Sequence, residues 1–185
     1  MANFLIQFLK HPRSIGAIAP SSRFLAAKMM EPIDFAAAAC IVEYGPGSGA
    51  FTRELVRRKR PATALILVEQ NPAFAGPLRA RYGAEPNVHV IQGSAADVMD
   101  LLTQHGFDRA DYIVSGLPFT SLPPELSAQI LTATQEALGA EGTFITFQYS
   151  MVKKALFARY FTLADTRWEP RNLPPAHTLV LKMKK

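Results

Sequence analysis

Three glycines at alternate positions mark the stretch of this chain with the strongest chemical signal. Gly45, Gly47 and Gly49 follow a short apolar run that ends at Glu43. Glycine tolerates unusual backbone angles and lets a ligand approach the main chain, so this spacing indicates a loop pressed against a bound molecule. Apolar residues at helical spacing follow from Phe51, so a helix is expected to start directly after the loop. The loop amides and the positive N-terminal end of this helix then face the same space. The stretch therefore predicts a strand, a ligand-binding loop and a helix start.

A second acidic residue stands where a nucleoside ligand would need one. Glu69 ends the next apolar run, residues 64–68, and follows Gly49 by about 20 residues. At this place in nucleotide-binding α/β sheets, a carboxylate accepts hydrogen bonds from the ribose hydroxyls. The two acids and the glycine loop together favour a ligand that carries a ribose. The alternative is an ordinary strand, glycine turn and helix with no ligand.

Two ligand classes use a loop of this kind. Residues 45–50 satisfy the relaxed dinucleotide fingerprint Gly-x-Gly-x-x-Ala, and residues 43–49 have the pattern Glu-x-Gly-x-Gly-x-Gly. The longer pattern resembles the first motif of the Rossmann-like S-adenosylmethionine (SAM) methyltransferases. That interpretation accounts for Glu43 and Gly49 as well, and Pro46 stiffens a loop that holds an amino-acid tail rather than a pyrophosphate. We therefore predict SAM as the cofactor and S-adenosylhomocysteine as its product.

Residues 115–119, Ser-Gly-Leu-Pro-Phe, form the second informative stretch. They follow the apolar run 111–114, at the carboxyl end of a predicted strand, where open α/β sheets bind ligands. The stretch is similar to the Asn-Leu-Pro-Tyr motif of the ribosomal RNA adenine dimethylases, but Gly116 replaces the asparagine. Adenine N6 is a poor nucleophile that benefits from a side-chain acceptor, whereas an aliphatic amine needs only to be deprotonated and aimed. The glycine therefore favours an aliphatic amine, held by the backbone carbonyls of Ser115 and Gly116.

These motifs, together with the small-residue loop over residues 14–22, resemble the bacterial phospholipid N-methyltransferases of the soluble, peripheral kind. That family is related to the ribosomal RNA adenine dimethylases, and the resemblance covers nearly all of the chain. It implies stepwise, SAM-dependent methylation of phosphatidylethanolamine to phosphatidylcholine at the membrane surface. Two other functions stay open: an RNA adenine N6-methyltransferase, and a non-catalytic SAM-binding or NAD-binding module attached to a membrane.

Apolar periodicity and turn residues predict the elements that would position these motifs. Strands are expected at residues 40–43, 64–69, 88–91, 111–114, 143–149, 161–169 and 176–183, and helices at 3–11, 24–30, 51–56, 72–82, 126–138 and 152–160. The resemblance implies an α/β fold, namely the seven-stranded, Rossmann-like sheet of class I SAM methyltransferases with helices on both faces. We expect an N-terminal helical extension over residues 1–30 and the methyltransferase domain over residues 31–185.

The N-terminal segment has two interpretations. Residues 3–11 place their large apolar side chains on one helical face, and Pro12 ends the helix. A short, very apolar amphipathic helix followed by basic residues is typical of a helix that lies in a membrane interface. A terminal helix packed on its own core, or a lid over the ligand pocket, would show the same face. Docking on lipid and closing the pocket therefore remain alternatives.

Composition limits the class of protein and its partners. With 185 residues, 49% of them hydrophobic, the chain has the size of one domain with a full core. The net charge of +5 favours anionic partners, and we expect anionic lipids and phosphatidylethanolamine rather than nucleic acid. Cys40 is the single cysteine, so we expect no disulfide framework and no thiolate metal cluster. We also expect that the protein binds no metal and is a monomer. The sequence shows no signal peptide or spanning segment, which predicts a cytoplasmic protein on the inner face of the cell membrane.

The resemblance assigns roles to residues at the carboxyl ends of the predicted strands. The expected cofactor contacts are Glu43, Tyr44, Gly45, Gly47, Gly49, Glu69, Gln70, Gly93, Ser94, Ala95 and Ser115, with Ser94 where related enzymes carry an acid for the adenine amino group. The expected catalytic residues are Ser115, Gly116, Leu117, Pro118 and Phe119, with Phe119 packed against the methylammonium by cation–π attraction. The expected substrate contacts are Ile18, Ser21, Tyr149 and Arg171, with Arg171 on the lipid phosphate.

Overall fold

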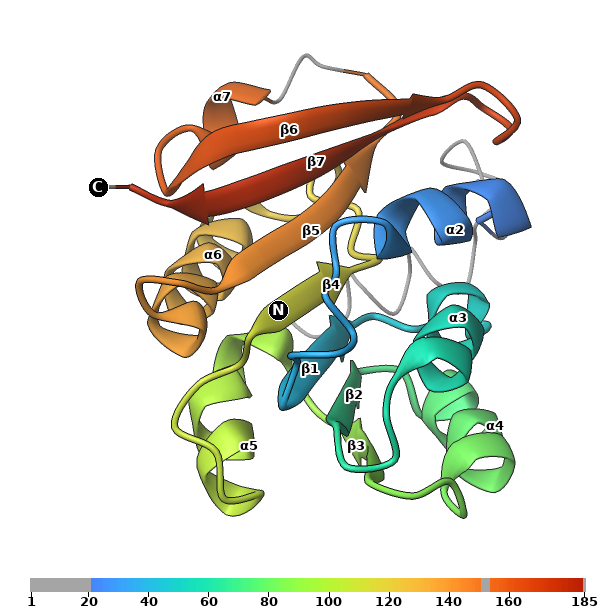
Figure 1. Cartoon of the computed structure of the whole chain (residues 1–185). Helices are drawn as coiled ribbons and strands as arrows, with labels where there is room; N and C mark the ends of the chain where they lie inside the picture. Colours follow the sequence, from blue (N-terminus) through green and yellow to red (C-terminus); the bar gives the residue numbers. More distant parts are fainter. Residues whose placement is uncertain (1–20, 151–153, 185) are drawn as a thin grey trace.

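Seven strands form one sheet in the order β3-β2-β1-β4-β5-β7-β6 (Figure 1). The computed structural model describes residues 21–150 and 154–184. β7 runs antiparallel to both of its neighbours, and the other strand pairs are parallel. The strands are β1 Cys40–Tyr44, β2 Ala64–Glu69, β3 Val88–Gln92, β4 Tyr112–Ser115, β5 Thr143–Gln148, β6 Phe161–Glu169 and β7 Ala176–Met183. The helices are α2 Arg23–Met30, α3 Ala50–Arg58, α4 Pro72–Tyr82, η1 Ala95–Asp97, α5 Val98–Gln104, α6 Pro124–Leu138 and α7 Lys154–Phe157.

Helices cover both faces of the sheet (Figure 1). α2, α3 and α4 lie on one face, and η1, α5, α6 and α7 lie on the other. β1 and β2 are buried along their whole length. A parallel sheet that is covered on both sides leaves no face for water, so its inner strands must be apolar throughout. This burial explains the continuous apolar runs that predicted the two strands.

The carboxyl ends of β1 and β4 form the switch point of the sheet. β1 pairs with β2 on one side and with β4 on the other. Open α/β sheets bind ligands in the crevice outside the strands at such a point. The glycine loop follows β1 and the Ser-Gly-Leu-Pro-Phe stretch begins at the end of β4, and the two stretches touch where the Gly116 N–H donates to the Tyr44 carbonyl oxygen at 2.8 Å. The fold therefore brings both sequence motifs to the same place.

The predicted fold class is confirmed, and most predicted elements agree with the structure within two residues. α7 is an exception, because it spans only Lys154–Phe157 where we predicted a helix over residues 152–160. Phe157 is buried in the core, and the chain then turns through a bond from the Tyr160 N–H to the Phe157 carbonyl at 3.0 Å to enter β6. α5 and the short η1 before it were not predicted.

α2 belongs to the core of the domain. Leu25 and Met29 are fully buried, and the helix packs on α3 and under the β6–β7 hairpin. We predicted residues 1–30 as an extension outside the methyltransferase domain. α2, the described part of this segment, covers one face of the sheet, and the division at residue 30 stays a prediction. The amphipathic segment 3–11 lies outside the described residues, so both of its interpretations remain predictions.

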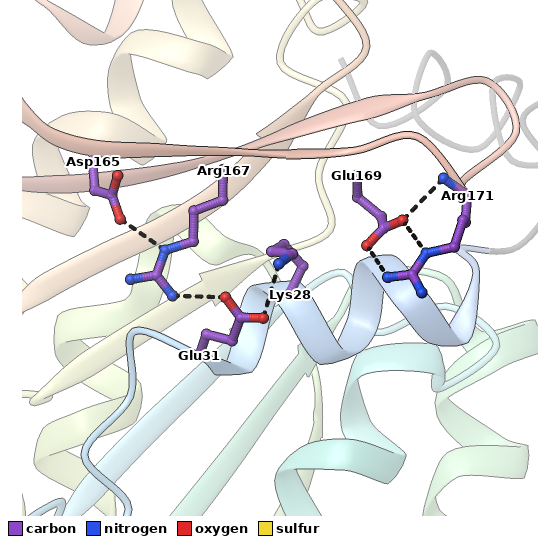
Figure 2. Close-up of polar contacts among 6 residues, drawn as sticks. All are labelled: Lys28, Glu31, Asp165, Arg167, Glu169 and Arg171. Carbon is purple, nitrogen blue, oxygen red and sulfur yellow. Dashed lines mark hydrogen bonds and ion pairs between the residues drawn. The ribbon is translucent and has the colours of Figure 1, made fainter.

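Ion pairs join α2 to the edge strand β6 (Figure 2). Arg167 on β6 donates to Asp165 Oδ2 at 2.7 Å and to Glu31 Oε2, at the end of α2, at 3.0 Å. Glu31 also pairs with Lys28 at 3.0 Å. These side chains are partly exposed, so water and salt screen the pairs and they add little net stability. Burial of the apolar face of α2 holds the helix in place, and the ion pairs favour one alignment of the helix along the hairpin.

Candidate active site

Backbone hydrogen bonds hold the glycine loop between β1 and α3. The Gly45 N–H donates to the Val68 carbonyl at 3.0 Å, and the Gly49 N–H donates to the Pro46 carbonyl at 2.8 Å. Gly47 has a φ of 53°, in the left-handed region that favours glycine. A Cβ added at Gly47 would come no closer than 4.0 Å to its nearest neighbour, the Gly45 carbonyl oxygen. This part of the loop therefore faces open space, as a loop that binds a ligand through its backbone requires.

Glu69, at the end of β2, lies against this loop. Its Oε2 accepts a hydrogen bond from the Gly47 N–H at 2.9 Å, and its Oε1 accepts one from the Asn71 N–H at 2.8 Å. Burial raises the pKa of the Glu69 carboxyl, and these hydrogen bonds act against that rise. The carboxylate has about four acceptor positions, and with a third backbone bond, from Gln70, it retains about one for a ribose hydroxyl. The geometry fits the predicted role of Glu69 as the ribose acceptor.

Glu43, at the carboxyl end of β1, is buried with one oxygen unsatisfied. The Thr52 hydroxyl donates to Glu43 Oε2 at 2.8 Å, but no group of the described residues donates to Oε1. Burial raises the pKa of the Glu43 carboxyl to about 8, and the nearby Glu69 adds to the rise. An unpaired buried acceptor costs about 1–3 kcal/mol, which a cationic N–H donor would offset. The α-ammonium of the SAM methionine tail is such a donor, so Glu43 fits that end of the cofactor.

The Tyr44 side chain does not face this site. The ring is fully buried in the core on the α5 and α6 face of the sheet. Its hydroxyl accepts a hydrogen bond from Thr134 Oγ1 at 3.3 Å. Alternate residues of a strand point to opposite faces, so Tyr44 and its neighbour Glu43 cannot both point to the same side. Only the backbone of Tyr44 lies at the site.

The predicted adenine contacts follow β3, beside Glu69. The Gly93 N–H donates to the Glu69 carbonyl oxygen at 3.1 Å, which fixes the start of this turn. Ser94 Oγ accepts a hydrogen bond from the Ala96 N–H at 3.2 Å and caps η1. The hydroxyl proton is not used in this cap, so Ser94 retains a donor for a ring nitrogen. Gln70 directly follows Glu69 along the same edge of the sheet. The roles of Gln70, Gly93, Ser94 and Ala95 remain predictions.

Gly116 packs tightly on the glycine loop. A Cβ added there would lie 2.8 Å from the Gly45 carbonyl oxygen and 3.5 Å from the Tyr44 carbonyl oxygen. The Ser115 hydroxyl accepts from the Leu117 N–H at 3.1 Å and holds the turn in this position. We expected the missing side chain to leave room beside the methyl donor, but the loop backbone fills that space. The close approach of two backbones, rather than an open pocket, requires glycine at this position.

Phe119 is a core residue, contrary to our prediction that its ring contacts the methylammonium. It is 1% exposed, and it makes edge-to-face contacts with Phe144 at 6.1 Å and Phe157 at 5.4 Å between ring centroids. Both ring faces are therefore directed at protein. The aromatic residue of this motif anchors the loop after β4, and Pro118 adds a turn through its carbonyl, which accepts from the Ser121 N–H at 2.8 Å.

Arg171 is bound to a protein carboxylate, contrary to its predicted role on a lipid phosphate. Its Nε and Nη2 donate to Glu169 Oε1 and Oε2 at 2.8 and 2.9 Å (Figure 2). This bidentate pair holds the pKa of the Glu169 carboxyl at about 2, so the carboxylate stays charged. The guanidinium also lies over the Phe24 ring, 4.1 Å from its centroid. The Nε–Nη2 edge of the guanidinium is therefore already occupied by Glu169.

The other predicted substrate residues lie near Asn172. Tyr149 follows β5 and packs edge-on against Phe147 with centroids 5.3 Å apart. Burial raises the pKa of Tyr149 to about 12, with Asn172 close by acting against that rise. Ser21 is half-buried, and the next residue, Ser22, donates its N–H to Asn172 Oδ1 at 2.9 Å. The structure thus brings Tyr149 and Ser21 to one place, whereas Ile18 lies outside the described residues.

Two residues of this region were missed by the sequence analysis. Thr52 holds Glu43, and its signal was a polar side chain on the buried face of an amphipathic helix. Asn172 joins the β6–β7 turn to α2 across 150 residues of sequence, and nothing local predicts such a contact. Cys40 is not reactive, because burial raises the pKa of its thiol to about 12. Within residues 21–150 and 154–184, no three His, Cys, Asp or Glu side chains are grouped as a metal site would need.

Comparison with known proteins identifies the family. The model of the ribosomal RNA adenine dimethylase family matches residues 7–163. The chain belongs to this family. A relative in Singulisphaera acidiphila, ornithine lipid N-methyltransferase, is 37% identical over 175 residues, which cover 94% of this chain and 91% of that protein. Ribosomal RNA small subunit methyltransferase A of Geobacter metallireducens is 30% identical over 108 residues, which cover 57% of this chain and 38% of that protein.

Solved structures agree on the fold of this family member. The 1,6-didemethyltoxoflavin-N1-methyltransferase of Burkholderia thailandensis, solved with S-adenosylhomocysteine, has a TM-score of 0.71 at 14% identity and covers 100% of this chain and 87% of that chain. The N-methyltransferase NodS of Bradyrhizobium japonicum, also solved with S-adenosylhomocysteine, has a TM-score of 0.67 at 11% identity, covering 88% and 86%. The protein is a SAM-dependent methyltransferase, which confirms the predicted cofactor.

Proposed function

We propose that this enzyme methylates the amine of phosphatidylethanolamine and of its methylated derivatives, giving phosphatidylcholine. The match to the ornithine lipid N-methyltransferase extends over almost the whole of both chains. The chain spans only about a third of the length of the ribosomal RNA methyltransferases that it matches. A whole-length match to an enzyme named for a lipid supports a lipid amine as substrate. In this proposal the protein acts as a monomer at the inner face of the cell membrane.

The observation that carries the proposal is the packing of Gly116 on the glycine loop. Adenine-directed relatives have an asparagine in this motif, whose amide holds the weakly nucleophilic N6. Here a Cβ would meet the Gly45 carbonyl oxygen at 2.8 Å, so this backbone arrangement cannot accommodate the asparagine side chain. The acceptors left at the end of β4 are backbone carbonyls, which suffice for an aliphatic amine. Gly116 thus excludes the adenine-binding amide by geometry as well as by sequence.

The residues at the switch point have separate tasks in this proposal. SAM supplies a methyl group bound to a positively charged sulfur. The neutral amine of the substrate attacks the methyl carbon from the side opposite the sulfur, and the carbon–sulfur bond breaks. Glu43 binds the ammonium end of the cofactor and Glu69 binds its ribose. The carbonyls of Ser115 and Gly116 accept the amine N–H bonds and aim the lone pair. A carbonyl does not take up a proton, so the substrate ammonium loses its proton to water before attack. Alignment of this kind lowers a barrier by ~7 kcal/mol or more in favourable cases.

Methyl transfer to defined acceptors tests the proposal. The purified protein is incubated with methyl-labelled SAM and, in parallel, with vesicles of phosphatidylglycerol containing phosphatidylethanolamine, the same vesicles with an ornithine lipid, and vesicles without an amine lipid. We expect label in the organic phase with phosphatidylethanolamine, and chromatography should resolve the mono-, di- and trimethylated lipids. Label in the ornithine lipid alone would overturn the choice of phosphatidylethanolamine. No label in any lipid would overturn the lipid proposal.

The second candidate function is methylation of adenine N6 in RNA. The family name and the net charge of +5 favour it. The match covers about a third of the length of the ribosomal RNA methyltransferases, and this chain has Gly116 where their motif has asparagine, which weighs against adenine. Label in ribosomal RNA under the same conditions, recovered as methylated adenosine, would make this the function.

A further inference from the structure

Two large apolar side chains stand out of the β6–β7 hairpin into solvent. Leu173, in the turn, is 78% exposed, and Trp168, near the end of β6, is 59% exposed. Single apolar residues at a surface need no explanation, but two in one hairpin at the edge of a candidate site do. Burying each of them would remove apolar area from water, which is favourable. The hairpin end is therefore a place where something apolar is expected to bind.

The exposed end of the hairpin lies on the same edge of the sheet as the candidate active site. His177, at the start of β7, pairs with Gln148 at the carboxyl end of β5 and with Trp168 on β6. β5 is parallel to β4, which ends at Ser115. The turn thus extends beyond the carboxyl end of β5 and lies next to the start of α2 (Figure 1). A surface that docked through Leu173 would face the edge at which SAM binds.

Fixed contacts beneath the turn hold Leu173 in its exposed position. Its neighbour Asn172 is 3% exposed, accepts from the Ser22 N–H at 2.9 Å and donates to the Pro174 carbonyl at 2.7 Å. On its other side, Arg171 is held by Glu169 through the Nε and Nη2 atoms of its guanidinium. The turn is therefore tied to α2 and to β6 on either side of Leu173. An apolar side chain presented by such a rigid turn enters a binding surface with little loss of backbone entropy.

Positive charge surrounds the exposed leucine. Arg23 is exposed over the Phe24 ring at 4.8 Å, and among the described residues no carboxylate pairs with it. The Arg171 side chain is 60% exposed, whereas that of its partner Glu169 is 1% exposed. The cations therefore reach solvent while the carboxylate lies beneath them. An exposed leucine near two arginines, with an exposed tryptophan on the same hairpin, matches a bilayer interface, which takes apolar and aromatic side chains at its boundary and attracts basic groups through anionic headgroups.

We propose that Trp168, Leu173 and Arg23 form a docking surface for an anionic lipid bilayer. This inference rests on the proposed lipid substrate, since it explains how the headgroup amine reaches the carboxyl edge. Leu173 enters the acyl boundary, Trp168 lies at the headgroup level, and Arg23 contacts anionic headgroups. The docked surface then holds the site against the membrane, so that a lipid presents its amine without leaving the bilayer.

The chain contains a single tryptophan, so its fluorescence reports on this surface alone. Emission of the intact protein is recorded with vesicles of phosphatidylglycerol and phosphatidylethanolamine, with and without brominated acyl chains. We expect a shift to shorter wavelength on binding and quenching by the brominated lipid. Leu173→Ser should weaken vesicle binding at least fivefold in co-sedimentation. Arg23→Ser should weaken it less, and mainly at low salt, because exposed charges are screened within about 8 Å at physiological ionic strength.

A matched control is available at the opposite edge of the sheet. Arg81, at the end of α4, lies over the Tyr82 ring at 5.2 Å much as Arg23 lies over Phe24. Arg81→Ser removes the same charge and should leave vesicle binding unchanged. A loss equal to that of Arg23→Ser would show that only net charge matters and would overturn the proposal.

Two further results would overturn the docking surface. The first is sedimentation with vesicles while Trp168 emission stays unchanged, because the protein would then dock through another face. The second is emission already at short wavelength in buffer and unaffected by vesicles, because a second copy or another part of this chain would then cover the hairpin. Quenching by brominated lipid without any methyl transfer to lipid would uphold the docking surface and refute the proposed function. If the protein methylates lipid and Leu173→Ser keeps full activity, the proposed function would stand and the docking surface would be refuted.

Discussion

The cofactor side and the predicted substrate side of this site differ in how their polar groups are satisfied. On the cofactor side, Glu43 Oε1 is buried without a partner in the described protein, and the Glu69 carboxylate accepts from the backbone of the glycine loop. On the substrate side, Arg171 is paired with Glu169 and Phe119 is packed into the core, whereas the buried Tyr149 hydroxyl has no partner among the described residues. Buried polar groups are normally paired, so an unpaired one calls for a ligand. Glu43 and Tyr149 therefore retain a polar atom for a ligand, whereas Arg171 and Phe119 already make their contacts within the protein.

The largest expected effect comes from Gly116→Ala, where the two sides meet. The added Cβ would lie 2.8 Å from the Gly45 carbonyl oxygen, so the glycine loop must shift. We expect methyl transfer to fall at least ~100-fold, about 2.7 kcal/mol in the barrier. SAM affinity, measured by calorimetry, should fall with it.

Gly76→Ala in α4 is the matched control. A Cβ there meets nothing within 4 Å, and alanine favours a helix, so activity should be unchanged. If Gly116→Ala lost activity with SAM affinity intact, the glycine would face the substrate, as the sequence suggested, rather than the loop.

The sequence predicted the cofactor side because its determinants are local. The sequence alone is enough to recognise an acid that ends an apolar run and glycines spaced within one loop. The environment of Gly116 could not be predicted from the sequence, since it depends on the close approach of Gly45 in the loop after β1. The same holds for Arg171, whose contact with Phe24 joins a helix and a hairpin far apart in sequence. Continuous apolar runs predicted the buried strands β1 and β2, but α5, with three buried residues among its seven, was missed.

Glu69→Ala should weaken SAM binding by ~10-fold or more, because hydrogen bonds to a charged acceptor contribute about 1.5–3 kcal/mol. It should also lower Tm, since the Gly47 and Asn71 N–H groups lose their acceptor. Glu69→Gln, which keeps one acceptor oxygen, should be intermediate in both measurements. Unchanged affinity in calorimetry for both variants would place the cofactor elsewhere.

Arg171→Ala should affect stability rather than catalysis. Removing the guanidinium leaves the Glu169 carboxylate without its partner, and Tm should fall by on the order of 2–4 °C. Glu169 has a lowered pKa, so the stabilisation is present above the unfolded pKa and is lost as pH falls towards about 2. The Tm deficit of the variant should therefore shrink in acid. If the variant instead raised the KM for lipid and left Tm unchanged, Arg171 would contact the lipid substrate, as the sequence analysis predicted.

The smallest effect is expected from Glu43→Gln in the absence of ligand. The folded protein holds a proton on Glu43 up to about pH 8, whereas the unfolded chain loses it near pH 4.5. The stability from this group is thus full below pH 4.5 and is lost as pH rises to about 8. Glu43→Gln should remove that loss and raise Tm at pH 8 by on the order of 2 °C, while weakening SAM binding. If the variant were less stable than the unmodified protein at pH 8, burial of the charged Glu43 carboxylate would not destabilise the free protein.

The central claim, that this site takes an aliphatic lipid amine rather than adenine, is tested most directly by competition in one reaction. Unmodified protein and methyl-labelled SAM are given phosphatidylethanolamine vesicles and ribosomal RNA together, and the label is divided by extraction between the organic and aqueous phases. We predict label in the organic phase as methylated phosphatidylethanolamine, with the RNA at background. Label in the aqueous phase as methylated adenosine, with the lipid at background, would contradict the claim.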